Sequence, residues 1–357
     1  MMMSHSTEPV PQHICVVLLS GLGDVIHGLP VVNALRDSID GLRITWVVEP
    51  MPSGILEGHP SIDRVVVYRK SEGLGGLRRL WRELVVAGPF DATMNFNVYL
   101  KSIWPVLLSR SPRRIGFDWK RTFEGVWLAS DDRIPAKPVA HTAEMFLEFA
   151  AHLGVDAPDP EWRITFTEPE VEEMQQYFRR FDGRPVATLI PASASHKKDW
   201  ITKRWTELAD VLARDFGFRV VIAGGPGARE QAIGREILGT ASRTPEWAMG
   251  DSVRRLAGII SGSSLVIAPD TGPVHIARAL GVPVIGIYGH TNPWRVGPWN
   301  AYQDLWIDHY TRGDPDPSNR TPRWDVMPGI TTVEVLSKVQ LAIDRYGVDK
   351  QRPAANR

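Results

Sequence analysis

The feature that most constrains the fold of this chain is a strand–turn–helix unit that opens each of its halves. Short apolar runs alternate with amphipathic stretches almost throughout the sequence. Runs such as VVLL and VVV are continuously apolar, as strands buried on both faces are. In the first half we expect strands at 14–20, 43–49, 64–68, 91–97 and 113–118, and helices at 25–38, 74–86, 99–108 and 140–154. This alternation favours a parallel sheet covered by helices.

The same pattern restarts after a Pro/Asp-rich stretch at 157–162. Here we expect strands at 186–190, 219–223, 264–268 and 283–288, and helices at 204–216, 228–238, 253–261 and 272–280. A length of 357 residues agrees with two domains. We predict an N-terminal domain at 1–168, a linker at 169–184, a second domain at 185–330, a terminal helix within 331–347 and a tail at 348–357. Open α/β sheets bind ligands beyond the carboxyl ends of their strands, so a site in an interdomain cleft is expected.

Composition excludes several other classes of protein. The single cysteine, Cys15, excludes a disulfide framework and a Cys-rich metal site. No apolar stretch reaches the roughly 20 residues of a membrane-spanning helix, and the N-terminus lacks the basic region of a signal peptide. We therefore expect a cytoplasmic protein. With 41 basic and 41 acidic side chains the formal net charge is zero, which argues against a nucleic-acid partner.

The first predicted strand ends in the turn SGLGDVIHGLP. Gly21 and Gly23 allow a sharp turn before a helix, as in half of a dinucleotide-binding motif. The third glycine of that motif is replaced by Ile26, although Glu49 ends the second strand where a ribose-binding acid would lie. Asp24 fits two roles: a cap of the helix, or a general base at the mouth of the strand.

Two loops of the second half carry further candidates. Ser193 and Lys198 lie in the loop PASASHKKDW, where a lysine can place its charge on a phosphate or simply belong to a solvated cluster. Glu230 follows the turn GGPG, where it could bind a ribose or stabilise the dipole of its own helix.

The most informative stretch is PDTGPVHIA, which follows a buried strand. Asp270 ends the strand, and Thr271 and Gly272 form a tight turn. Pro273 suits the first position of a helix. The start of that helix would offer free N–H groups to an anion, with His275 in its first turn.

Together these motifs resemble glycosyltransferase family 9, the heptosyltransferases. Asp270-Thr271-Gly272-Pro273-Val274-His275, followed by Tyr288-Gly289 and Thr291-Asn292-Pro293, is similar to the family's C-terminal signature. The segment SGLGDVIHGLP and the run Lys198-Asp199-Trp200 are similar to two further family motifs. Departures are Ile201 for a proline, and His290 and Asn292 for the commoner Pro and Asp.

The resemblance implies a GT-B fold: two Rossmann-like, doubly wound domains facing a cleft, with the terminal helix packing back on the N-terminal domain. It implies transfer of heptose from ADP-heptose to the inner core of lipopolysaccharide, with inversion and without metal or cofactor. Asp24 would be the base, and Lys198 would bind the diphosphate. Substrate-binding residues would be Gly23, Ser193, Glu230, Asp270, Thr271, Gly272 and His275. Asp314-Pro315-Asp316 matches a D-x-D metal motif, but its Pro-rich setting indicates a turn.

The charge of the chain is unevenly distributed. Residues 64–121 contain twelve Lys/Arg and four Asp/Glu, a local charge of +8. An anionic lipopolysaccharide core and the inner-membrane surface both fit such a region, which would make the protein peripheral on that membrane. A solvated helix face is the alternative. Trp81, Trp104 and Trp119 lie in the same region, at an interface or in the core.

Three alternatives remain open from the sequence. The enzyme could be a family member that uses another nucleotide sugar or another glycan acceptor. It could be an NAD-dependent oxidoreductase, because of the Gly21/Gly23 turn. It could also be a protein that binds a nucleotide sugar without transferring it, although the set Asp24, Lys198 and Asp270 argues against this.

Overall fold

The computed structural model describes residues 10–250 and 252–353, and these divide into two compact units. Unit 1 takes 10–20, 28–137 and 144–163, and unit 2 takes 21–27, 138–143 and 164–353. The chain therefore passes into unit 2 at residue 164, before the expected linker. By its contacts, the beginning of the first helix belongs to unit 2.

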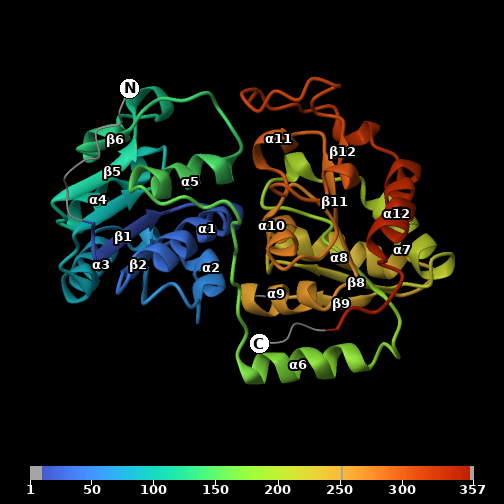
Figure 1. The fold of residues 1–357 in the computed structure, drawn as a ribbon. Helices are drawn as coiled ribbons and strands as arrows, with labels where there is room; N and C mark the ends of the chain where they lie inside the picture. Colours follow the sequence, from blue (N-terminus) through green and yellow to red (C-terminus); the bar gives the residue numbers. More distant parts are fainter. Residues whose placement is uncertain (1–9, 251, 354–357) are drawn as a thin grey trace. The chain divides into compact units, whose positions relative to one another are not determined.

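Within the described residues, unit 1 is built on a six-stranded sheet in which every pairing is parallel (Figure 1). Its strands, from one edge to the other, are β3 (Arg64–Val67), β2 (Arg43–Val48), β1 (His13–Leu18), β4 (Ala92–Asn95), β5 (Arg113–Phe117) and β6 (Asp132–Ile134). This strand order, 3-2-1-4-5-6, is that of a doubly wound sheet. The strand order reverses between β1 and β4.

Helices cover both faces of this sheet. They are α1 (Leu22–Ser38), α2 (Pro50–Ser53), α3 (Gly73–Ala87), α4 (Ile103–Leu108) and α5 (Thr142–His152). Side chains alternate along β1, so Cys15 and Val17 pack with Leu80 and Leu84 of α3 and Val106 of α4. On the other face, Phe96 packs against Trp46 and against Phe149 of α5. Gly28 of α1 approaches the Trp46 ring closely, because a Cβ there would lie 3.0 Å from it.

Unit 2 repeats the topology on a second six-stranded parallel sheet of the described chain. Its strands, from one edge to the other, are β9 (Glu246–Met249), β8 (Arg219–Gly224), β7 (Val186–Leu189), β10 (Leu265–Pro269), β11 (Val284–Tyr288) and β12 (Ile307–Asp308). The helices are α6 (Glu168–Arg179), α7 (Thr202–Arg214), α8 (Ala228–Thr240), α9 (Val253–Ser261), α10 (Gly272–Ala279), α11 (Pro293–Val296) and α12 (Thr332–Tyr346). Here the order reverses between β7 and β10.

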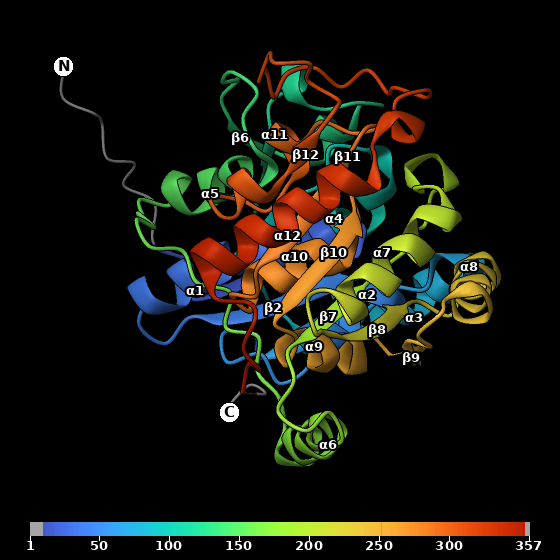
Figure 2. The ribbon, with the colours of Figure 1, turned by 90° about the vertical axis from the view of Figure 1, so that its right-hand side faces the viewer.

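The terminal helix α12 belongs to unit 2. Its apolar residues Val335, Val339 and Ala342 share one core with Trp205 and Leu208 of α7. Figure 2 shows α12 running beside α7. The prediction that this helix packs on the N-terminal domain is therefore wrong. Its apolar face is already buried on the sheet of unit 2, and sequence periodicity reveals such a face without revealing its partner.

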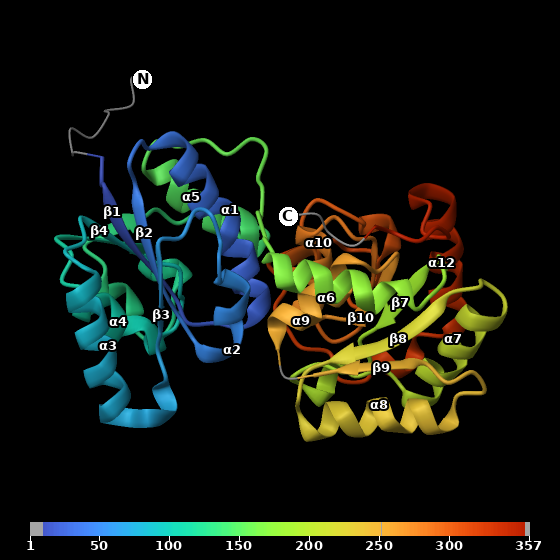
Figure 3. The same ribbon diagram turned by 90° about the horizontal axis from the view of Figure 1, so that it is seen from below.

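Helix α6 lies along α9, as Figure 3 shows. Met174 and Phe178 of α6 meet two glycines, since a Cβ on Gly258 or Gly262 would lie only 2.5 or 2.3 Å from these side chains. Most of the segment expected as a linker at 169–184 is thus helix α6, which belongs to unit 2 and packs on its helix α9. None of the helices in the described part of the chain is long and apolar enough to cross a membrane.

Candidate active site

The candidate residues of unit 2 gather where the parallel strands β7, β10 and β11 end. β10 pairs with β7 on one side and β11 on the other, so their carboxyl ends share one edge of the sheet. β7 is followed by the loop that carries Ser193 and the 3-10 turn His196–Lys198, and β10 is followed directly by Asp270. This edge is the point where the strand order reverses, the usual ligand position in such sheets.

Lys198 and Asp270 form an ion pair at this edge. The Lys198 ammonium donates a hydrogen bond to Oδ2 of Asp270 at 2.6 Å, across 72 residues of sequence. Burial alone would raise the pKa of Asp270, but the charge and hydrogen bond of Lys198 and a hydrogen bond from Thr291 lower it below its usual value. Asp270 is buried, whereas about a quarter of the Lys198 side chain is exposed. The ammonium is thus held on a buried carboxylate by a side chain that is itself partly exposed.

Helix α10 begins next to this pair. Its N-cap is Thr271 in extended backbone, and the Thr271 side chain caps nothing within the described chain. Pro273 has no N–H, so the backbone amides of Thr271 and Gly272 are the donors at this end. Gly272 is required by packing, since a Cβ would lie 2.8 Å from the Leu22 side chain. A helix start beside an ammonium is a site for an anion such as a phosphate.

Gly23 and Asp24 in the first turn of α1 approach the same place. A Cβ on Gly23 would lie 2.6 Å from Cδ2 of His275, so only glycine fits there. The Asp24 carboxylate is close enough to His275 to act on its pKa. Burial lowers the pKa of His275 below its usual value, with Asp270 and Asp24 opposing that shift and Lys198 adding to it. His275 is therefore a neutral imidazole at neutral pH.

Sequence reasoning missed two further histidines: His27, whose ring contacts that of His275, and His141, whose ring contacts that of His27. The ring of His27 lies 4.4 Å from the His275 ring and 5.0 Å from that of His141, between ring centroids. Burial, followed by the neighbouring histidines, lowers the pKa of His27 well below its usual value, and burial lowers that of His141 to about 3. These histidines are more than 100 residues apart in the sequence, which gives no signal that residues 27, 141 and 275 come together.

The loop that carries Ser193 is held by a network that sequence reasoning also missed. The Ser193 N–H donates to Oδ1 of Asp199 at 3.3 Å, and its hydroxyl donates to the Ser195 carbonyl at 2.9 Å. Arg229, at the start of α8, donates to the Asp199 carboxylate and to the Ser193 carbonyl. Ser193 is buried, so its hydroxyl is engaged in shaping the loop.

Glu230 lies in the first turn of α8, after the glycine turn that follows the neighbouring strand β8. Its carboxylate sits over the glycine turn, since a Cβ on Gly225 or Gly227 would lie 2.9 or 2.6 Å from its Oε2. These glycines let a carboxylate lie at the mouth of β8, at the start of α8. Arg229, next to it in sequence, joins this strand end to the Ser193 loop.

Two of the three residues that depart from the family pattern, His290 and Asn292, have structural roles. Asn292 caps α11 by accepting from the Trp294 N–H at 3.1 Å, and its amide donates to the Asp316 carbonyl at 2.7 Å. His290 Nδ1 lies 2.7 Å from the Arg323 carbonyl. Both therefore hold the long loop at 311–329. Within that loop the Asp316 carboxylate accepts from the Ser318 N–H and hydroxyl at 2.8 and 2.6 Å, and the described residues contain no cluster of three metal-ligating side chains.

The structure thus brings Gly23, Asp24, Lys198, the Asp270–Gly272 turn and His275 to one place in unit 2. Ser193 and Glu230 belong to the loops after β7 and β8. The structure gives no support to the dinucleotide-binding alternative, because Ile26 occupies the position of the third glycine of that motif and its side chain is fully buried.

Comparison with known proteins identifies the family. Residues 77–314 match the sequence model described as glycosyltransferase family 9 (heptosyltransferase). The lipopolysaccharide core heptosyltransferase OpsX of Haemophilus influenzae is 31% identical over 296 residues, 83% of this chain and 84% of that protein. Lipopolysaccharide heptosyltransferase 1 of Escherichia coli K12 is 27% identical over 300 residues, 81% of this chain and 92% of that protein.

Solved structures agree on the fold. A family 9 glycosyltransferase from Veillonella parvula has a TM-score of 0.78 at 23% identity, covering 92% of this chain and 96% of that one. The E. coli heptosyltransferase WaaC, solved with ADP, has a TM-score of 0.74 at 22% identity, covering 92% and 99%. The expected GT-B fold is confirmed. This chain belongs to glycosyltransferase family 9, the heptosyltransferases, and is a glycosyltransferase.

Proposed function

We propose that this enzyme transfers heptose from ADP-heptose to the inner core of lipopolysaccharide, on Kdo-lipid A or on a heptosyl residue already attached. The observation that carries the proposal is the Lys198–Asp270 ion pair at the start of α10. Together with the start of that helix, it offers one positive charge and two backbone N–H groups to a diphosphate. Asp24, in the same unit, supplies a carboxylate beside this anion site.

The proposed chemistry is a single displacement at the anomeric carbon. The acceptor oxygen forms a bond to that carbon while the bond from the carbon to the ADP phosphate oxygen breaks, which inverts the configuration. Asp24 takes the proton of the acceptor hydroxyl. The negative charge that develops on the leaving diphosphate is stabilised by the Lys198 ammonium and by the amides of Thr271 and Gly272.

The remaining residues would bind and orient the donor. Asp270 fixes the Lys198 ammonium. Asp270 and the neutral His275 would both lie beside the diphosphate. Glu230 at the mouth of β8 would accept hydrogen bonds from the ribose hydroxyls. Ser193 would shape the loop that covers the phosphates, with Gly23 allowing the backbone before Asp24 to approach.

The choice of donor and acceptor is supported by the relatives. OpsX is named as a lipopolysaccharide core heptosyltransferase, and the E. coli neighbour was solved with ADP. The +8 charge of residues 64–121 suits an acceptor that carries phosphates and carboxylates. We place the enzyme on the cytoplasmic side of the inner membrane, where such a lipid acceptor is made.

A donor panel tests the proposal. ADP-heptose, UDP-sugars and GDP-sugars are each incubated with a heptose-free core lipid, and nucleotide release and product mass are followed. We expect transfer from ADP-heptose, with a product whose anomeric configuration, read by NMR, is opposite to that of the donor. Transfer from a UDP- or GDP-sugar alone would reject the donor, and nucleotide binding without transfer to any acceptor would reject the enzymatic role.

A further inference from the structure

The loop at 311–329 is long, and the proposed function does not use it. It lies between β12 and α12, and Figures 1 and 2 show it at the end of unit 2 that carries α11. The loop is held in place, because the Asn292 amide donates to the Asp316 carbonyl at 2.7 Å and Arg204 of α7 donates to the Pro328 carbonyl at 2.7 Å. A loop of this length is usually either functional or disordered. This one is fixed, which points to function.

The loop presents Trp324, whose side chain is 60% exposed, the most of any aromatic side chain in the described residues. Two contacts hold its ring all the same. The Lys197 ammonium lies 3.9 Å from the ring centroid, and the His290 ring lies 5.0 Å away between centroids, tilted by 66°. His290 also donates from Nδ1 to the Arg323 carbonyl at 2.7 Å, which fixes the backbone beside the indole. An exposed ring that is already held in place loses little further freedom when a ligand stacks on it.

Both contacts put the indole beside the proposed diphosphate site. Lys197 is followed in sequence by Lys198, whose ammonium holds the Asp270 carboxylate. His290 is followed by Thr291, whose side chain hydrogen-bonds to the same carboxylate. Consecutive residues have Cα atoms only about 3.8 Å apart. Each residue that holds the indole therefore adjoins a residue that binds this carboxylate.

The order of the strands relates the indole to one part of the donor. Along the sheet of unit 2 the strands β8, β7, β10 and β11 are neighbours in that order. Glu230, proposed for the ribose, follows β8, and the Lys198–Asp270 pair, proposed for the diphosphate, lies where β7 and β10 end. His290 follows β11, on the far side of this pair from Glu230. A donor whose ribose and diphosphate lie in that order brings its transferred sugar toward β11, where the indole is held.

A sugar ring is a suitable ligand for an indole. One face of a pyranose presents C–H groups whose hydrogens carry a partial positive charge, and the face of an indole is apolar and carries a partial negative charge. The hydroxyls at the rim of the sugar stay free to bind polar groups. A hydroxyl that points from the stacked face toward the indole prevents close contact, so stacking discriminates between sugars by their configuration.

We propose that Trp324 stacks on the sugar ring of the nucleotide-sugar donor and takes part in selecting that sugar, with His290 and Lys197 as positioning residues that hold the indole. The inference rests on the proposed function, which supplies the donor. His290 stands where the family pattern commonly has a proline, and a proline side chain has no donor for the Arg323 carbonyl. This departure from the pattern is therefore part of the proposed sugar subsite.

Calorimetry on the full chain without acceptor tests the proposal, with ADP and ADP-heptose as the two ligands. Trp324→Ala should bind ADP like the unchanged enzyme and ADP-heptose about tenfold more weakly. Trp324→Phe keeps an aromatic face and should lose about threefold or less. His290→Ala should weaken ADP-heptose binding less than Trp324→Ala does. The double variant should bind like Trp324→Ala alone, because His290 acts through the indole.

A spectroscopic readout separates direct contact from a structural effect. The chain has 13 tryptophans, and in protein labelled with fluorotryptophan the Trp324 signal in the fluorine NMR spectrum is the one missing from Trp324→Phe. This signal should shift when ADP-heptose is added and shift clearly less when ADP is added. The same shift with both ligands would mean that the sugar does not reach the indole, and would overturn the proposal.

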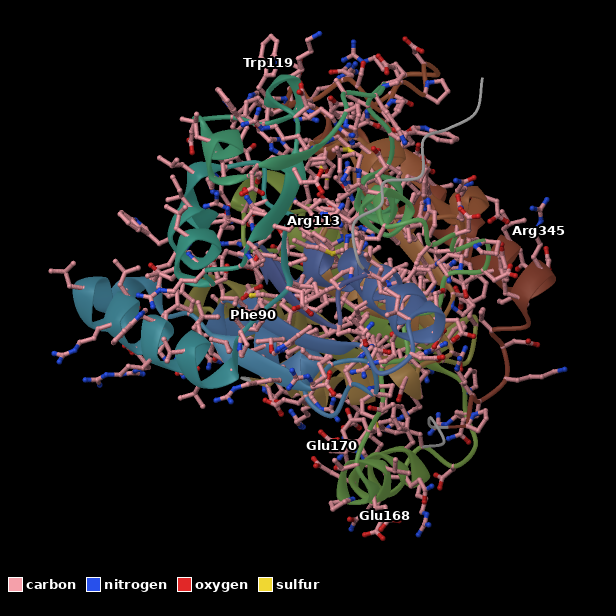
Figure 4. All side chains as sticks on the ribbon, turned by 60° about the vertical axis from the view of Figure 1, so that its left-hand side comes forward. Phe90, Arg113, Trp119, Glu168, Glu170 and Arg345 are labelled. Carbon is pink, nitrogen blue, oxygen red and sulfur yellow. The ribbon has the colours of Figure 1, made fainter. Side chains whose placement is uncertain are left out.

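Trp119 of unit 1 provides a matched control. It is 57% exposed, and the Lys120 ammonium lies 5.5 Å from its ring centroid. Its side chain points outward from the ribbon in Figure 4. Trp119→Ala should bind both ligands like the unchanged enzyme, and an equal loss of ADP-heptose affinity in Trp119→Ala and Trp324→Ala would overturn the proposal. So would equal weakening of ADP and ADP-heptose in Trp324→Ala, or a loss confined to the KM for the acceptor, which would assign the indole to the sugar of the acceptor.

Failure of the proposed function gives a different result. If the unchanged enzyme binds ADP but neither binds nor uses ADP-heptose, the proposed donor is rejected. The nucleotide sugar that the donor panel selects and its free nucleotide then take the place of the two ligands in the same comparison, and Trp324→Ala decides the stacking contact as before. A protein that binds no nucleotide sugar at all would reject both proposals.

Discussion

The two sheets have the same strand order and differ in what lies where that order reverses. In unit 1, the position between β1 and β4 is closed by neutral amides: Asn97 accepts from the Leu19 N–H at 3.0 Å and donates to the Val17 carbonyl at 2.9 Å. In unit 2, the corresponding position between β7 and β10 holds the Lys198–Asp270 ion pair at 2.6 Å. The same topology thus holds, in unit 1, a junction whose side-chain amide is hydrogen-bonded to its own backbone and, in unit 2, a junction with a charged pair.

The difference shows that topology provides a place for a ligand, and side chains decide whether it is used. Asn97 uses its oxygen and its amide on backbone groups of its own unit. Lys198 is attached to one carboxylate and remains partly exposed. The charges also differ in their position, because eight of the twelve Lys/Arg at 64–121 in unit 1 are exposed, whereas unit 2 keeps this ion pair near the edge of its sheet.

The largest expected effect is on the base of the proposed reaction. Asp24→Asn should lower kcat by about 10²–10⁴-fold, because the acceptor hydroxyl loses its proton acceptor. ADP affinity should stay nearly unchanged. Steady-state ADP release measures the first quantity and calorimetry the second. The matched control is Asp40→Asn, an exposed aspartate just beyond the end of α1; equal losses in both variants would remove Asp24 from the chemistry.

The close approach of α1 to His275 offers a steric test. Gly23→Ala places a Cβ 2.6 Å from the His275 ring, and we expect a loss of about 1–3 kcal/mol in the free energy of unfolding together with reduced turnover. Gly21→Ala meets nothing within 4 Å and serves as control. Chemical denaturation reports both; a Gly23 variant as stable and active as the Gly21 variant would show that this approach is not required.

The junction of unit 1 should behave as structure alone. Asn97→Ala leaves the buried Leu19 N–H without its partner and removes one of the two hydrogen bonds to the Val17 carbonyl, which keeps that from the Phe96 N–H. This should cost about 1–3 kcal/mol of unfolding free energy. ADP affinity should not change, because the anion site belongs to unit 2. Denaturation and calorimetry on the same sample decide this; weakened ADP binding in the folded variant would break the contrast between the two sheets.

The smallest expected effect concerns acid stability. Burial lowers the pKa of His27 and His275, so the unfolded chain binds more protons once the pH falls below about 6.5. Their contribution to stability is complete above pH 6.5 and is lost as the pH falls from there toward the folded-state pKa values, by up to about 1.4 kcal/mol per pH unit for each histidine.

The histidine contribution is tested with His27→Leu. Both ring nitrogens of His27 lack a hydrogen-bond partner among the described residues, so an apolar side chain should be tolerated at neutral pH. The variant should lose stability less steeply than the unchanged protein between pH 6 and 5, as read from unfolding curves. Parallel curves for the two proteins would mean that His27 does not titrate in the unfolding transition.

Much of the fold followed from local signals. Strands buried on both faces are continuously apolar, so β1, β2, β7, β10 and β11 were predicted within a few residues of their ends. The edge strands β6 and β12 were missed because they have only three and two residues. Strand β9 was missed because its sequence, EWAM, begins with a charged residue and is buried at only two of its four positions. The packing partner of α12 was predicted wrongly for another reason. An amphipathic pattern shows that a helix buries one side, but it does not show which sheet covers that side.

The site was predicted where its residues lie within one motif, as in Asp270, Thr271, Gly272 and His275. Pairings across long stretches of sequence gave no signal. The contact between Asp199 and Arg229 depends on two loops that the sheet of unit 2 brings together. The contact between His27 and His141 depends on the segments 21–27 and 138–143, which belong to unit 2 although they lie far from it in sequence. In the sequence alone, nothing distinguishes these four residues from ordinary surface or core residues.

The central claim is that the Lys198–Asp270 pair at the start of α10 holds the donor diphosphate. Calorimetric titration of ADP into Lys198→Ala tests it most directly, with Lys197→Ala as control, because the Lys197 ammonium lies over the Trp324 ring at 3.9 Å and away from this role. Loss of one charge-assisted contact should weaken ADP binding by about 10–100-fold in Lys198→Ala and leave Lys197→Ala within about twofold of the unchanged enzyme. Equal ADP affinity in the two variants would contradict the account.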